Sequence, residues 1–113
     1  MKNIITVFKL LSDENRLRIL FMLKQKKLCA CEMLEVLNIT GATLSAHLKF
    51  LRLSGIVDQQ KDGRWIEYSL IDKNIIKILN FIENFITDKT VINNDQEKIK
   101  AMDKREEVCK KRK

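Results

Sequence analysis

The sequence predicts a mainly α-helical fold with one small β-hairpin. The chain has 113 residues, of which 45% are hydrophobic, with three glycines and no proline. Apolar residues recur at helical spacing through most of the chain, and the period changes only between Ile56 and Leu70. A chain of this length is expected to form one domain with a hydrophobic core, and it gains stability from a partner.

Two short helices are predicted at the start of the chain. Apolar side chains recur at the spacing of one helix face between Ile4 and Leu11. Ser12 and Asp13 follow, and both are residue types that cap helix N-termini. The apolar side chains of residues 17–23 and the lysines that follow them predict a second helix, with cations at its end.

A third and a fourth helix follow, joined by a tight turn. Residues 29–37 form a short apolar stretch, and Asn38-Ile39 turns the chain. Thr40 is the predicted N-cap of the fourth helix, and Gly55 ends that helix as a C-terminal glycine. The apolar face of the fourth helix consists of Leu44, Leu48 and Leu51.

A β-hairpin is predicted next. Residues 57–61 and 64–70 flank Asp62-Gly63, a dipeptide typical of tight hairpin turns with positive φ angles. Apolar and polar side chains alternate along the second strand, as in a half-buried strand. Two helices joined by a tight turn and followed by a hairpin are typical of a winged helix-turn-helix, which is therefore the predicted architecture.

A last long helix is predicted from about residue 74 to residue 89. Its apolar stripe is widened by Ile76 and Phe81 beyond what one small core needs. After Thr90 the chain becomes polar and charged, and the pattern leaves open whether it continues as a helix. We therefore divide the chain into a domain of residues 1–90 and a basic tail of residues 91–113.

The charge distribution favours an anionic partner, with nucleic acid first. The chain has 22 basic and 15 acidic side chains, a formal net charge of +7. Eight of the basic and four of the acidic side chains lie between Gln96 and Lys113. The alternative is that the basic tail only keeps the protein in solution.

The fourth helix is the predicted DNA-reading element, because small side chains at its start let a helix approach base edges in the major groove. The hairpin cations are expected to meet phosphates, and Arg64 also the minor groove. The alternative is that these groups only cap a helix and face solvent. A histidine beside an apolar helix face, as at His47, more often packs or forms a hydrogen bond. The predicted contact residues are Thr40, Gly41, Thr43, Ser45, Ala46, His47, Lys49, Lys61 and Arg64.

The cysteines are the sharpest chemical feature, because thiolates are ligands for As(III), Sb(III), Cd(II), Pb(II), Cu(I) and Zn(II). Cys29 and Cys31 can hold one ion only if the third helix begins near Cys31 or is distorted. A helix N-terminus, and the four cations after Cys109, are expected to favour the thiolate forms. As(III) usually takes three thiolates, so Cys109 of the same chain or of a partner is the candidate third ligand. The alternative is that the pair packs in the core and Cys109 is an incidental thiol.

Three stretches resemble the ArsR/SmtB family of bacterial and archaeal metal-sensing repressors. They are LSDENRLRIL at 11–20, LCACEML at 28–34, and LSAHLKFL at 44–51 with SGIV at 54–57. The second stretch is similar to the thiol site of the arsenic-responsive branch. The resemblance covers about residues 4–85.

This resemblance implies a homodimer, held by the first and last helices, that represses its own operon and leaves DNA when an inducer binds. It places DNA contacts on residues 40–49 and on the wing around Arg64. Two departures stand out. Leu34 occupies the position of the third cysteine of the best-known arsenic-responsive branch. Glu83 alone represents the ligand types of the zinc-sensing branch in the last helix, so no interfacial zinc site is expected.

We therefore predict a repressor that releases operator DNA when As(III) or Sb(III) binds Cys29 and Cys31, with Cys109 as a candidate third ligand. The alternatives are a response to Cd(II) or Pb(II), and a redox or persulfide switch that joins Cys29 or Cys31 to Cys109. A module that docks through its basic tail to a protein or membrane surface is a further alternative.

An enzyme is not expected, because the chain has one histidine and no glycine-rich phosphate loop. A thiol oxidoreductase would more typically carry Cys-x-x-Cys within a strand-helix-strand unit. The odd number of cysteines and the lack of a leader after Met1 predict a cytoplasmic location. No apolar run is long enough to predict a membrane span.

Overall fold

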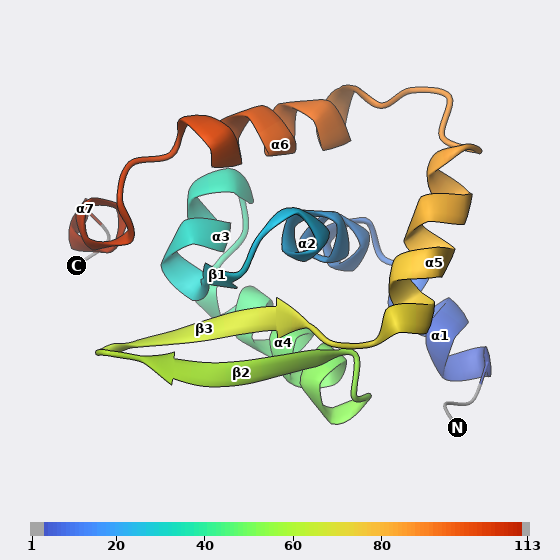
Figure 1. Ribbon diagram of the computed structural model, residues 1–113, viewed down its shortest axis with the longest axis horizontal. Coiled ribbons are helices and arrows are strands. Elements are labelled where there is room, and N and C mark those ends of the chain that lie inside the picture. The colour runs from blue at the N-terminus through green and yellow to red at the C-terminus, as the bar shows by residue number, and fades with distance from the viewer. Residues whose placement is uncertain (1–3, 112–113) are drawn as a thin grey trace.

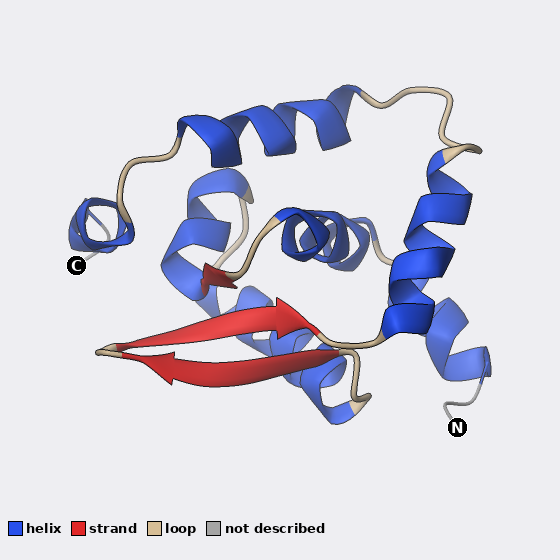
Figure 2. Cartoon of the chain, viewed as in Figure 1, coloured by secondary structure: helices blue, strands red, loops and turns tan. Residues whose placement is uncertain are grey.

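The computed structural model describes residues 4–111, which form helices and a small three-stranded antiparallel sheet that lies at one side of the molecule (Figure 1). The helices are α1 (Ile4–Leu11), α2 (Glu14–Gln25), α3 (Ala30–Val36), α4 (Gly41–Leu53), α5 (Lys73–Glu83), α6 (Thr90–Ala101) and α7 (Arg105–Lys111). The strands are β1 (Leu28–Cys29), β2 (Val57–Asp62) and β3 (Trp65–Leu70), and β3 lies between the other two. The predicted winged helix-turn-helix architecture is confirmed, with α2 at the centre of the view (Figure 2).

The N-caps of α2 and α4 are the residues that the sequence predicts. Asp13 accepts a hydrogen bond from the Arg16 backbone N–H at 3.0 Å and so begins α2. Thr40 accepts one from the Thr43 backbone N–H at 3.1 Å and begins α4. Gly55 has a φ of 74°, the left-handed conformation that ends a helix at low cost for glycine.

The hairpin differs by one residue from the prediction. Asp62 pairs with Trp65 at the end of the ladder, so the turn consists of Gly63 and Arg64 rather than Asp62-Gly63. Gly63 supplies the positive φ of 61° that a tight turn requires. A further strand, β1, was not predicted, because two residues carry no periodicity of their own. It pairs with β3 through Leu28 and Cys29.

The predicted long helix after residue 74 is shorter than expected, and α1 has eight residues. α5 ends at Glu83 with a tightened last turn, in which the Asn84 N–H donates to the Phe81 carbonyl at 3.2 Å. The chain then returns along α2 as α6, where Ile92 and Ile99 join the core. Asp95 of α6 accepts two hydrogen bonds from the Arg18 guanidinium, both at 2.9 Å. We divided the chain at residue 90 into a domain and a tail. In the structure the segment after that position begins with α6, which packs against the domain.

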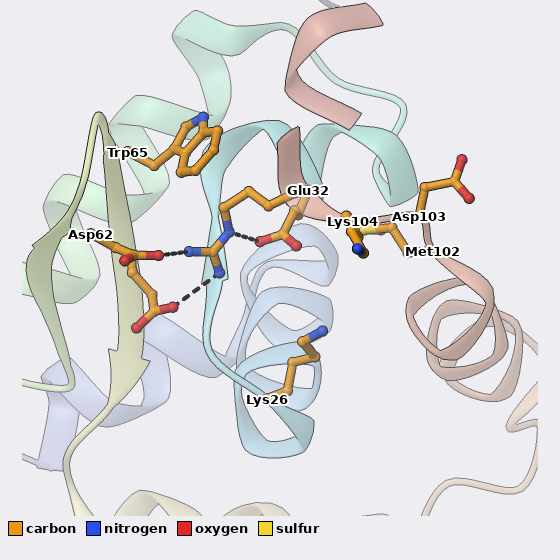
Figure 3. A pocket seen from close by; sticks show the side chains of 9 residues that line it. Lys26, Glu32, Asp62, Trp65, Met102, Asp103 and Lys104 are labelled. Carbon is orange, nitrogen blue, oxygen red and sulfur yellow. Dashed lines mark hydrogen bonds and ion pairs between the residues drawn. The ribbon is translucent and has the colours of Figure 1, made fainter. Parts of the chain in front are cut away.

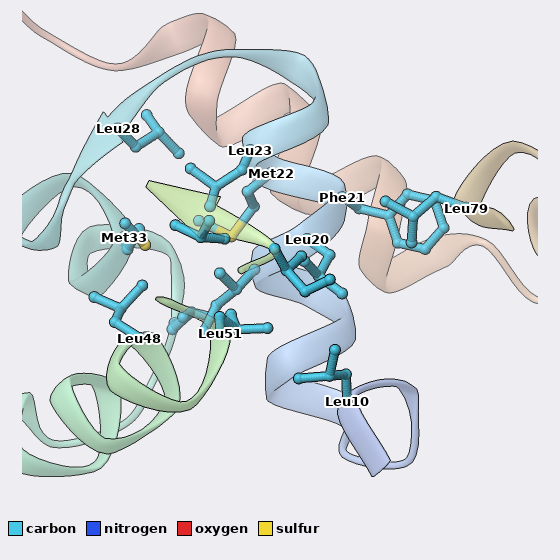
Figure 4. Close-up of a cluster of buried hydrophobic side chains, with 14 of the residues drawn as sticks. Leu10, Leu20, Phe21, Met22, Leu23, Leu28, Met33, Leu48, Leu51 and Leu79 are labelled. Carbon is cyan, nitrogen blue, oxygen red and sulfur yellow. The ribbon is translucent and has the colours of Figure 1, made fainter. Parts of the chain in front are cut away.

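The hydrophobic core is centred on α2 and extends to every neighbouring helix (Figure 4). Leu10, Leu20 and Leu51 are fully buried, and they come from α1, α2 and α4. Replacing one such leucine with alanine costs about 2–5 kcal/mol in stability. Helix α4 and the hairpin share this core with α2, through Leu51 and Val57. Between residues 4 and 111 no helix is long and apolar enough to span a membrane.

Candidate DNA-binding surface and thiol site

The first turns of α4 present small polar groups on the surface. The side chains of Thr43, Ser45 and Lys49 are exposed, whereas Leu44 and Leu48 are buried under them. Two predicted contact residues of α4, Gly41 and Ala46, are exposed as well, as is Thr40 at the cap. At Gly41, apart from its sequence neighbours and the backbone of its own helix, no heavy atom lies within 4 Å of where a Cβ would stand, so the backbone there is open to a ligand. This face has the size and chemistry that a major groove accepts.

His47 differs from the other predicted contact residues because it faces the protein. Its side chain is only 13% exposed, and its Nε2 lies 3.8 Å from Oδ1 of Asp13. Its Nδ1 lies 3.5 Å from Nη1 of Arg16, which also donates from Nη2 to the Lys9 carbonyl at 2.6 Å. Arg16 stacks over the ring of Phe50, 4.8 Å from its centre. His47 thus ties α4 to α2.

The wing presents Lys61 and Arg64, and both side chains are exposed. The Arg64 guanidinium stacks over the Trp65 ring at 4.9 Å, and its Nη2 lies 3.3 Å from Oε1 of Glu106. Side chains of Arg64 and Glu106 are 62% and 66% exposed, so water screens this ion pair. The predicted phosphate contact is therefore paired with α7 in this structure.

Two cysteines from opposite ends of the chain meet beside α3. Cys29, the last residue of β1, and Cys109, in α7, have their Sγ atoms 3.6 Å apart. Both thiols are buried, while Cys31 in the first turn of α3 is partly exposed. α3 begins at Ala30 and Cys29 keeps an extended backbone, so the condition set by the Cys-x-Cys spacing is met.

For Cys29 and Cys109 the structure contradicts the expectation that the thiolate forms are favoured. Burial raises the pKa of the Cys29 thiol, and the hydrogen bond that the Glu32 backbone N–H donates to that thiol offsets the rise only in part. Burial also raises the pKa of the Cys109 thiol, and hydrogen bonds with Cys31 and Cys29 raise it further. Desolvation outweighs the helix N-terminus and the exposed Lys110 and Lys111. These two thiols are therefore protonated at neutral pH.

The three thiols are neighbours but do not form a ready-made site. In residues 4–111, no three or more His, Cys, Asp or Glu side chains are arranged to hold a metal ion as they stand. The close pair is Cys29 with Cys109, and Cys31 acts on Cys109 through a hydrogen bond. A site with three sulfur ligands requires side-chain movement at the start of α3.

Arg105 is a central residue that the sequence did not single out. Its guanidinium donates to Glu32 at 2.9 Å, to Asp62 at 2.7 Å and to Glu67 at 3.0 Å (Figure 3). These groups line an open pocket of about 490 Å³ together with Trp65. Arg105 is one of eight cations in the last 18 residues, so no local pattern distinguishes it.

Apolar side chains remain exposed on α1 and α5, at the same end of the molecule (Figure 1). Ile5 and Phe8 of α1 are 57% and 62% exposed, and Phe81 of α5 is 63% exposed. Phe85, just beyond α5, is 69% exposed and contacts Phe81, with ring centres 5.1 Å apart. These are the helices on which the resemblance places a dimer interface.

Comparison with known proteins decides the family. The model of the family described as "Bacterial regulatory protein, arsR family" matches residues 13–59. The arsenical resistance operon repressor of Staphylococcus aureus is 40% identical over 85 residues, which are 72% of this chain and 81% of that protein. The chain belongs to the ArsR family of bacterial regulatory proteins. The predicted family and the prediction of a regulatory protein are confirmed.

Other ArsR-family relatives carry a different metal in their names. The cadmium resistance transcriptional regulatory protein CadC of Listeria innocua is 46% identical over 77 residues, 67% of this chain. This chain spans 62% of the length of that relative. Among solved structures, the transcriptional repressor BigR from Xylella fastidiosa matches with a TM-score of 0.70 and 26% identity. That match covers 75% of this chain and 87% of BigR.

The ArsR-family match includes Cys29 and Cys31 but ends before β3. Cys109 and Arg105 lie well outside it. α7 and its contacts are therefore features of this chain that the family model does not describe.

Proposed function

We propose that this ArsR-family protein is a homodimeric repressor that releases its operator when As(III) or Sb(III) binds Cys29, Cys31 and Cys109. The observation that carries the proposal is the 3.6 Å approach of Cys29 and Cys109, with Cys31 as their neighbour. A soft ion bound there joins α7 to the start of α3, the helix that precedes the reading helix.

The DNA-binding half of the proposal depends on the exposed face of α4 and on the wing. Thr43, Ser45 and Lys49 are exposed on α4, where they can form hydrogen bonds and contribute charge in a major groove. Lys61 and Arg64 of the wing are placed to contact phosphates. His47 supports α4 from behind. The exposed apolar side chains of α1 and α5 suit a second copy of the chain, which would set two such helices on related half-sites about one helical turn apart.

Burial of the thiols favours As(III) over Cd(II). Arsenous acid condenses with three thiols and releases three waters, As(OH)₃ + 3 RSH → As(SR)₃ + 3 H₂O, and the product is neutral. Cd(II) with three thiols gives an anionic complex and releases three protons. Cys29 and Cys109 are 2% and 6% exposed, and an environment this dry disfavours an added charge.

A second candidate function is favoured by the same distance. Two thiols 3.6 Å apart can form a disulfide when an oxidant removes two electrons, as in 2 RSH + H₂O₂ → RSSR + 2 H₂O. Cys31 is not required for that reaction. A redox switch therefore predicts a response to peroxide that survives Cys31→Ser, whereas the metalloid site predicts one to arsenite that does not.

The test is release of DNA. Fluorescently labelled DNA from upstream of the protein's own gene is titrated with fully reduced protein at one salt concentration, and arsenite is then added. The proposal expects a loss of anisotropy at micromolar arsenite without any oxidant. Release by peroxide alone would support the redox switch, and release by Cd(II) alone would contradict the preference for As(III).

A further inference from the structure

The ion pairs of α7 connect the thiol site to the wing. Oε1 of Glu32 accepts a hydrogen bond from the Cys29 backbone N–H and another from Nε of Arg105, both at 2.9 Å. The other two nitrogens of the Arg105 guanidinium donate to Asp62 and Glu67 on the two strands of the wing. Glu32, which directly follows Cys31 in sequence and accepts from the Cys29 backbone, is thus one side chain away from the hairpin (Figure 3).

This network is partly buried, so its ion pairs are less screened by water than ion pairs at the surface. The side chains of Arg105 and Glu32 are 15% and 4% exposed, and Glu67 is 24% exposed. Charge-assisted bonds from a planar guanidinium fix both distance and orientation, and in a dry environment they are stronger than at the surface. A displacement of Arg105 therefore changes the position of the wing or leaves carboxylates without a partner.

Glu106, the residue after Arg105 in α7, forms an ion pair with Arg64 at the tip of the wing. Glu106 pairs with Arg64 at 3.3 Å, and Arg64 is the wing residue expected to meet DNA phosphate. A DNA-bound wing needs that guanidinium free. Since the pair is exposed, it is weak, so a phosphate displaces Glu106 readily unless α7 is held in place by something else.

We propose that α7 is a ligand-controlled latch on the wing, with Arg105 as its positioning residue and Glu106 as the group that competes with DNA for Arg64. This inference rests on the proposed function, because a bound ion that bridges Cys109 to Cys29 supplies the hold on α7. With the ion bound, Arg105 stays on Asp62 and Glu67 and Glu106 stays on Arg64. Without it, α7 shifts when the wing meets DNA. The two positions of α7 are the two states that ligand and DNA each bias.

The test compares two α7 variants with two matched controls. Arg105→Gln removes the positioning residue, and Lys104→Gln makes the same charge change one position earlier. Glu106→Gln removes the competitor of DNA, and Glu107→Gln makes the same charge change at the next exposed position. For each reduced protein, arsenite binding is measured from the near-ultraviolet absorbance of arsenic–thiolate bonds. The operator Kd is measured by anisotropy with and without arsenite.

The latch predicts that a variant can bind arsenite normally and yet fail to release DNA in response. In the wild type the ratio of the two Kd values is expected to lie in the range of about 5–150 that is typical of coupled sites. Arg105→Gln should bring this ratio to within about twofold of one, while the arsenite affinity stays within about threefold of the wild type. Glu106→Gln should lower the ratio by about two- to fivefold, as expected for an exposed pair. Both controls should keep the wild-type ratio.

Two results would overturn the latch while leaving the proposed function intact. One is a wild-type ratio in Arg105→Gln and in Glu106→Gln. The other is loss of arsenite binding in Arg105→Gln together with an unchanged ratio in Glu106→Gln, which would assign Arg105 to building the site. A wild-type protein that binds operator DNA but no arsenite would overturn the proposed function itself, and the latch with it.

Discussion

The segment from α2 to β2 and the segment from α6 to α7 are organised by different kinds of contact. In the first, α2 and α4 begin with their own side-chain caps, Asp13 and Thr40, and each cap bonds a residue three positions further on in sequence. In the second, the decisive contacts join residues about 80 positions apart, Arg18 with Asp95 and Cys29 with Cys109. The first segment is the one that the family model matches. The comparison teaches that the segment matched by the family model is organised by local contacts, whereas the C-terminal segment outside that match is held by contacts across the whole chain.

Substitution of the thiols is expected to have the largest effect, because it should abolish the response to arsenite without changing DNA binding. Cys29→Ser and Cys31→Ser should leave operator affinity unchanged and abolish release by arsenite, because each removes one ligand and no DNA contact. Anisotropy titrations of both variants check this. The interpretation fails if either variant responds to arsenite with unchanged affinity, since the ligands would then lie elsewhere.

Asp95→Asn should lower the free energy of unfolding, because it breaks the ion pair that holds α6 on α2. It leaves the Arg18 guanidinium beside an uncharged group in a place where the Asp95 side chain is 4% exposed. Breaking a buried pair in this manner costs about 3–5 kcal/mol. Urea unfolding monitored by circular dichroism should show that loss. Asp88→Asn, at an exposed position before α6, serves as the control, and an equal loss there would contradict the argument.

The pH dependence of affinity should distinguish two classes of inducer. Because the pKa values of Cys29 and Cys109 are raised, both thiols stay protonated through neutral pH, and Cd(II) must displace their protons. Its affinity should therefore rise as pH rises, by about tenfold per pH unit for each proton released. Arsenous acid releases water and no net proton, so its affinity should stay nearly flat between about pH 6.5 and 8.5. Calorimetry at several pH values measures both slopes.

Arg64→Ala has the smallest expected effect on DNA binding. It removes one phosphate contact, so binding to all sequences should weaken by a similar small factor, and the log–log salt slope should decrease by about 1. Since the same side chain pairs with Glu106, the arsenite response should shrink as well. An unchanged salt slope would remove Arg64 from the DNA contacts, and Lys61→Ala then becomes the next substitution to measure.

The sequence predicted most of the winged helix-turn-helix and little of the way in which α6 and α7 pack on it. Helices α2 and α4, with their own caps, and a hairpin with glycine at its turn are specified locally, which explains why these elements were predicted, the hairpin to within one residue. β1 was missed because its two residues form a strand only by pairing with β3. The packing of α6, the raised pKa of Cys109 and the role of Arg105 depend on contacts across the whole chain, and a charged segment gives no local sign of them.

The most direct test of this account examines the joint between the two segments. Arsenic X-ray absorption on the reduced wild-type protein loaded with one equivalent of arsenite counts the sulfur atoms bound to the ion. We predict three sulfur neighbours in the wild type and two sulfurs with one oxygen in Cys109→Ser. Two sulfurs and one oxygen in the wild type, unchanged by Cys109→Ser, would show that α7 takes no part in binding and would contradict the account.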